Sequence, residues 1–195
     1  MKTSYLDANI LIAISVGPDK ERDQFRMARG VLNDIKNGVI IGIVSPLVLM
    51  EVISVMRKQK GKEVGHLGSM SPEEQSKFVL HESGVMYEKL VSELMKLPNL
   101  KFELGRRIDL NAVMDAALDI LHKIRGRVQS YEKRRESGSR RAAYTAFKGV
   151  GPDDVFHALL AKDVGCSDLI TFDRGFEELG EFDEFEDLEF RVLKW

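Results

Sequence analysis

The sequence predicts an α/β fold with three layers (α/β/α), in which helices cover both faces of a central, mainly parallel sheet. Short apolar runs alternate with longer amphipathic stretches along the chain, and strands that alternate with helices form parallel sheets. The run VIIGIV at 39–44 is apolar on both faces, as expected for a strand covered on both sides. With 195 residues and a 44% hydrophobic share, the chain is long and apolar enough for one such domain.

The individual elements follow from apolar spacing and end signals. Apolar residues at helical spacing predict helices that glycine or proline ends, and short β-branched runs predict strands. The expected elements are a strand at 3–6, a helix at 19–37, a strand at 39–44, a helix from 46, a polar and glycine-rich loop at 57–72, a helix from 71 or 72 to about 97, a strand at 100–104, a helix at 110–124 capped by Asp109, a helix from 152 that Gly165 ends, a strand at 168–172, a short helix at 174–179 and an edge strand at 190–193.

Composition places the chain in a broad class. We expect a single domain over 1–195, with extra helices and a basic loop inserted at 57–149. The single cysteine, Cys166, excludes an internal disulfide and a cysteine-based zinc site, and we expect it to be structural. No apolar run is long enough for a membrane helix and the N-terminus lacks a secretory signal pattern, so we expect a cytoplasmic protein.

Charge is segregated along the chain although the net charge is only −2. Residues 123–148 are basic with interleaved aromatic residues, whereas 173–189 are strongly acidic. Basic residues mixed with aromatics suit a phosphate backbone with base stacking, but a solvated loop has the same composition, and both interpretations stay open. The candidate nucleic-acid contacts are Arg127, Lys133, Arg134, Arg135, Arg140 and Arg141.

Four acidic residues are expected at one edge of the sheet. Asp7 and Asp173 each follow a strand directly, Glu51 lies in the helix after the second strand, and Asp154 lies in the first turn of a helix. Each has a structural alternative, since Asp7 and Asp173 can cap helices, Asp154 can complement a helix dipole and Glu51 can be a surface acid. The carboxyl ends of parallel strands meet at one edge, so we expect these carboxylates to converge.

Converging carboxylates predict a bound metal ion. Without a cation they would repel one another and raise each other's pKa. A ligand set made only of oxygens selects Mg²⁺ or Mn²⁺ over zinc. Such an ion activates water and stabilises charge on phosphorus, so phosphodiester hydrolysis is the expected reaction.

Four motifs in order carry a resemblance: YLDANILI, SPLVLMEV, DDVFHALLA and LITFDRGF. They resemble the PIN-domain nucleases, especially the VapC-type toxins and their archaeal relatives, over about 3–56 and 150–193. The resemblance implies a metal-dependent endoribonuclease for single-stranded RNA, usually a homodimer, and an antitoxin protein as a partner if the chain is a toxin. It also implies functional positions, with Asp7, Glu51, Asp154 and Asp173 as catalytic metal ligands and Asn9, Ser45 and Thr171 as polar residues that orient water or carboxylates.

Two departures from the family pattern leave alternatives open. The region 57–149 is longer than a compact toxin of this family needs, which bears on the toxin role more than on nuclease chemistry. Asp153 competes with Asp154 for the third acidic position, but the spacing from Asp154 to His157 and Ala161 fits the family pattern D-x-x-H-x-x-x-A. We expect His157 to be a packed, hydrogen-bonded helix residue. The alternative functions are a non-catalytic or RNA-processing nucleic-acid-binding module and a structure-specific DNA nuclease.

Overall fold

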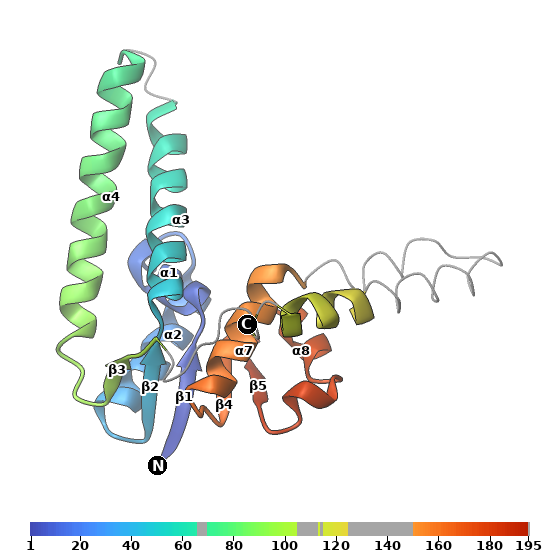
Figure 1. The fold of residues 1–195 in the computed structure, drawn as a ribbon. Helices are drawn as coiled ribbons and strands as arrows, with labels where there is room; N and C mark the ends of the chain where they lie inside the picture. Colours follow the sequence, from blue (N-terminus) through green and yellow to red (C-terminus); the bar gives the residue numbers. More distant parts are fainter. Residues whose placement is uncertain (66–69, 105–112, 114, 125–149, 195) are drawn as a thin grey trace. The chain divides into compact units, whose positions relative to one another are not determined.

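The computed structural model describes residues 1–65, 70–104, 113, 115–124 and 150–194 (Figure 1). The elements in these ranges are, in chain order, β1 (Lys2–Leu6), α1 (Ala8–Val16), α2 (Arg22–Lys36), β2 (Ile40–Val44), α3 (Pro46–Gly65), α4 (Pro72–Leu94), β3 (Leu100–Phe102), α7 (Pro152–Asp163), β4 (Asp168–Thr171), α8 (Gly175–Leu179), the 3₁₀ helix η1 (Asp183–Phe185) and β5 (Glu189–Val192). Residues 113 and 115–124 are also helical.

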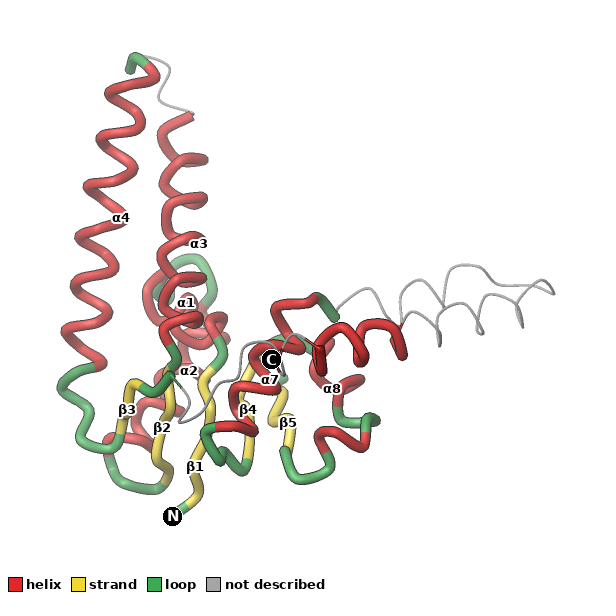
Figure 2. Tube along the Cα trace, viewed as in Figure 1, coloured by secondary structure: helices red, strands yellow, loops and turns green. Residues whose placement is uncertain are grey.

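The strands follow the order β3-β2-β1-β4-β5 in one five-stranded sheet. Strand β2 pairs with β3 in parallel, and β4 pairs with β5 in parallel. The alternation of strands and helices along the chain is plain in Figure 2. The α/β/α class with a parallel sheet, and β5 as an edge strand, are therefore confirmed.

Two compact units make up the chain, which we call the N-terminal unit (1–2 and 6–102) and the C-terminal unit (3–5 and 103–194). Among the described residues, no helix offers an apolar stretch long enough to cross a bilayer. The expected cap at Asp109 and the six basic residues at 127–141 lie outside the described residues. The single-domain organisation with an insertion at 57–149 stays a prediction.

A close approach at Gly42 fixes β2 in the N-terminal unit. Gly42 is opposite Leu100 in the β2–β3 register, and a Cβ atom at Gly42 would meet side-chain atoms of Ile35 at 2.6 Å and Leu100 at 2.7 Å. The Asn99 side chain donates to the Ile35 carbonyl at 2.9 Å, which ties the end of α2 to the start of β3. The strand that leads to Ser45 is thus held from two sides by packed side chains.

The predicted loop at 57–72 is wrong, because α3 continues to Gly65 and α4 begins at Pro72. The polar residues of this stretch form the solvent side of α3, while Val64 is 1% exposed. Figure 1 shows α3 and α4 as a long helical hairpin, and tertiary packing of this kind outweighs local composition. Ser71 caps α4 with a reciprocal pair of hydrogen bonds to Glu74, at 3.3 Å and 2.8 Å.

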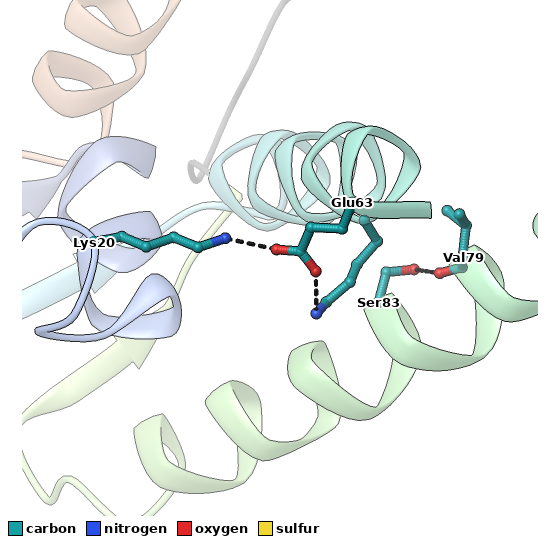
Figure 3. Close-up of polar contacts among 5 residues, drawn as sticks. Lys20, Glu63, Val79 and Ser83 are labelled. Carbon is teal, nitrogen blue, oxygen red and sulfur yellow. Dashed lines mark hydrogen bonds and ion pairs between the residues drawn. The ribbon is translucent and has the colours of Figure 1, made fainter. Parts of the chain in front are cut away.

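Polar contacts lie on each helix of the α3–α4 hairpin (Figure 3). Glu63 on α3 accepts hydrogen bonds from Lys20 at 2.6 Å and from Lys60 at 2.7 Å. These bonds, first that from Lys20 and then that from Lys60, lower the pKa of Glu63 to about 2. On α4, the buried Ser83 hydroxyl donates to the Val79 carbonyl at 2.6 Å, so its burial leaves the hydroxyl satisfied.

We expect Glu63→Gln to lower the free energy of unfolding by about 0.5–1 kcal/mol at pH 7. The depressed pKa of Glu63 means that its contribution is present above the unfolded value of 4.5 and is lost as pH falls toward about 2. The expected size is small because the Glu63 side chain is 42% exposed and solvent screens the pair. Urea denaturation at pH 6 and pH 3 measures it, with Glu73→Gln in the exposed pair with Lys77 as the control. If the wild type and Glu63→Gln differ in unfolding free energy by the same amount at both pH values, this account is contradicted.

Three phenylalanines build the core of the C-terminal unit around β5. The ring of Phe190 lies 5.8 Å from that of Phe176 and 5.7 Å from that of Phe185. Phe176 and Phe185 are 0% and 1% exposed. This cluster packs α8 and η1 beside β5, and it therefore fixes the segment that starts directly after Asp173.

Candidate functional site

Asp7 lies in the N-terminal unit at the junction of β1 and α1, and it is 6% exposed. One carboxylate oxygen accepts from the Ala8 backbone at 2.6 Å, and the other accepts from the Asn9 amide at 2.6 Å. Asp7 is therefore the cap of α1, which is the structural role that its position also predicted. The two hydrogen bonds give its carboxylate one fixed orientation. Each carboxylate oxygen can accept more than one interaction, so a residue that caps a helix can also be a metal ligand.

Glu51 lies on α3 in the same unit and is half-buried. Ser45, which is 2% exposed, starts this helix by accepting from the Val48 backbone at 3.3 Å. The structure brings Glu51 to Asp7, since a carboxylate oxygen of one lies within 4.8 Å of a carboxylate oxygen of the other. Two acids that are far apart in the sequence thus form a pair, as the strand-end argument predicts.

Asp173 lies in the C-terminal unit between β4 and α8 and is half-buried. Its Oδ1 atom accepts from the Gly175 backbone at 2.7 Å, and its own N–H donates to the buried Thr171 hydroxyl at 2.9 Å. The N-cap of α8 is Arg174, so the interpretation of Asp173 as the cap is wrong. Asp173 instead forms a turn just before the helix, and Thr171 fixes its backbone.

Asp154 lies in the first turn of α7 in the C-terminal unit. It is half-buried and accepts from the Gly151 backbone at 2.6 Å, whereas Asp153 is exposed. An acid in the first turn also complements the positive end of the helix dipole. Of the two neighbouring acids, Asp154 thus has the fixed and partly buried carboxylate that a ligand needs.

The PIN domain family model matches residues 4–181 of the chain. The chain belongs to the PIN domain family. The PIN domains are a nuclease family, and the match to this one includes the motifs that hold all four acidic residues and the intervening helices. The curated proteins gave no match to the chain.

The donor set of this PIN domain suits a hard divalent cation. Asp7 and Glu51 offer only carboxylate oxygens, which are the ligands that Mg²⁺ and Mn²⁺ prefer. Two oxygens bound to one Mg²⁺ at about 2.0–2.1 Å can be up to about 4.2 Å apart. The observed upper limit of 4.8 Å is close to this, so a small side-chain rotation lets both carboxylates share an ion.

His157 of the PIN domain is packed and hydrogen-bonded, as its helical position predicts. It is 2% exposed, and its Nδ1 atom lies 2.9 Å from the Tyr5 hydroxyl. Tyr5, which is fully buried in β1, begins the first of the four motifs, but the motif assigns it no role. No local pattern connects two residues 152 positions apart, and the only available signal was the inward side of a short strand.

The single cysteine of the PIN domain is structural, as predicted. Cys166 is buried, and burial, with a smaller effect of Asp168 and Glu103, raises the pKa of its thiol to about 12. A thiol with a raised pKa carries little thiolate at neutral pH, which agrees with a structural role.

Proposed function

We propose that this PIN domain is a metal-dependent endoribonuclease that hydrolyses phosphodiester bonds of single-stranded RNA. The observation that carries the proposal is the pair of Asp7 and Glu51 carboxylates within 4.8 Å of each other, in a chain of a nuclease family. Two partly buried carboxylates so close together repel unless a cation lies between them. The cap accounts for the position of Asp7, and the carboxylate of Glu51 beside it adds a second oxygen ligand of the kind that a divalent cation takes.

In this proposal, the ligands of Mg²⁺ or Mn²⁺ are Asp7, Glu51, Asp154 and Asp173, as the resemblance to the PIN-domain nucleases implies. When bound, the ion activates water and stabilises negative charge on the scissile phosphate. The chain's own polar residues keep the ligands in position. Asn9 fixes the carboxylate of Asp7, and backbone N–H groups fix one oxygen each of Asp154 and Asp173.

The proposal extends to the partners of the protein. The resemblance of the four motifs to those of VapC-type toxins supports a homodimer that an antitoxin protein neutralises. The basic residues at 127–141 supply charge for an RNA strand. An open reading frame for a small protein beside the gene, whose product inhibits cleavage, is the observation that tests the toxin role.

A cleavage assay on matched substrates tests the nuclease proposal. We expect the full chain to cut single-stranded RNA with Mn²⁺ or Mg²⁺, to leave flapped DNA intact and to lose activity in EDTA. Products should carry a 5′-phosphate, since water is the attacking group. Cleavage that EDTA does not affect, or products with 2′,3′-cyclic ends, would overturn the mechanism.

Calorimetry separates the nuclease from a binding module of the same fold. We expect Mn²⁺ to bind the wild-type chain and to bind Glu51→Gln at least about tenfold more weakly, because a charged ligand becomes a neutral one. RNA binding without any Mn²⁺ binding would favour the non-catalytic module instead.

A further inference from the structure

A pocket of about 400 Å³ lies between α2 and the segment that joins α4 to β3, all within the N-terminal unit. Three cations line it, and they are Arg29 and Lys36 from α2 and Lys96 from the joining segment. One acid, Glu93, lines it as well. The pocket thus has a net positive lining in a chain whose formal net charge is −2.

The three cations of this pocket are not used in ion pairs among the residues that the structure describes. Within the described part of the chain, Arg29, Lys36 and Lys96 form no ion pair, whereas Arg26 on the same α2 pairs with Asp23 at 3.3 Å. A position near the C-terminal end of α2 accounts for Lys36 through the helix dipole, but Arg29 lies mid-helix. Unpaired like charges around one cavity repel, and an anion bound there would relieve that repulsion.

The rest of the lining is Asn33 and three apolar residues. Leu32, which is 7% exposed, Leu97 and Pro98 line it beside the cations. Cations beside an apolar surface match a nucleotide, whose phosphate binds Arg and Lys and whose base and sugar cover apolar groups. A free inorganic anion would leave the apolar part uncovered.

A second pocket, of about 380 Å³, shares part of its lining with the first one. Arg29 and Glu93 line both pockets, and the second adds Phe25 and Lys89. Phe25 offers a ring for base stacking, and Glu93 offers an acceptor for a ribose 2′-hydroxyl or a base amino group. Glu93 also interrupts the apolar lining between the two pockets, which suits two separate nucleotides better than the continuous apolar face of a partner helix.

We propose that this groove between α2 and α4 holds two successive nucleotides of the single-stranded RNA substrate, with Arg29 on the phosphate between them. The proposal rests on the proposed function, because it places part of the RNA strand. The proposal adds a second binding site in addition to the acidic residues. Its cations belong to none of the sequence motifs. Its role is to hold the strand, so it affects substrate binding and leaves the chemical step unchanged.

Binding and cleavage by full-length variants test the proposal. The probe is a fluorescein-labelled 12-nucleotide single-stranded RNA, and anisotropy in EDTA gives its Kd between 50 and 200 mM salt. We expect Arg29→Ala and the double variant Lys36→Ala/Lys96→Ala each to weaken binding about tenfold or more. The slope of log K against log salt should fall by about 0.7 for each cation removed. In Mn²⁺, KM for the same RNA should rise while kcat stays unchanged.

Arg26→Ala is the matched control, because it removes an exposed charge from α2 outside the groove, and we expect it to keep the wild-type salt slope. If the wild type binds and cleaves RNA and both groove variants keep its affinity and salt slope, the groove proposal alone is overturned. That result would leave the groove for a protein partner. A wild type that neither binds nor cleaves RNA would overturn the proposed function, and the groove assignment with it.

Discussion

Asp7→Asn is expected to lower kcat for Mn²⁺-dependent RNA cleavage by roughly 10³-fold, on the order of 4 kcal/mol in the activation free energy. The change removes one negative charge from the pair that Asp7 forms with Glu51. It leaves the fold intact, because asparagine is as good a helix cap as aspartate and its oxygen can still accept from Ala8. The side-chain amide of the new asparagine faces the amide of Asn9, so the hydrogen bond from Asn9 to residue 7 is lost together with the charge. Single-turnover cleavage and thermal unfolding of the same samples measure the two effects separately.

The control for this prediction is Asp163→Asn, which removes an exposed acid at the end of α7 and should keep wild-type activity. We expect Asp173→Asn to behave like Asp7→Asn, because asparagine can still accept from Gly175 while the charge disappears. A loss of similar size would support a catalytic role for both carboxylates. More than about a tenth of wild-type activity in Asp7→Asn would place the chemistry elsewhere.

The sequence allowed prediction of the strands and of the acids at their ends, because both depend on local signals. Every strand that the structure describes agrees with a predicted one to within two residues, since a short β-branched run between helix stops has few other interpretations. The approach of Asp7 to Glu51 was predictable from topology, because parallel strands bring their carboxyl ends to one edge.

Features that depend on tertiary packing were not predictable in the same way. Residues 57–65 are polar or glycine except for Val64, and only the burial of Val64 in the folded hairpin reveals that α3 continues. The contact between Tyr5 and His157 joins residues 152 positions apart. The cations of the groove come from α2 and from the segment after α4, so no single window of sequence contains them. Each case combines side chains whose proximity exists only after folding.

Phe176→Ala is expected to lower the free energy of unfolding by about 3–5 kcal/mol, because it removes a fully buried ring and leaves a cavity beside Phe190. This is a large share of the stability of a domain this size. The effect also reaches the candidate site, since Gly175, the residue before Phe176, donates the hydrogen bond that fixes Asp173. Urea denaturation measures the first effect, and Mn²⁺ affinity under conditions where the variant remains folded measures the second.

Phe176→Leu is the control, because it keeps most of the apolar volume and should cost less than half as much as the alanine variant. The comparison tests whether packing of α8 positions Asp173. If packing does so, Mn²⁺ affinity falls with the size of the cavity, and the leucine variant lies between the alanine variant and the wild type. If the alanine variant loses stability but binds Mn²⁺ as tightly as the wild type, the hydrogen bond from Gly175 survives without the ring, and the Asp173 carboxylate is held by its local turn alone.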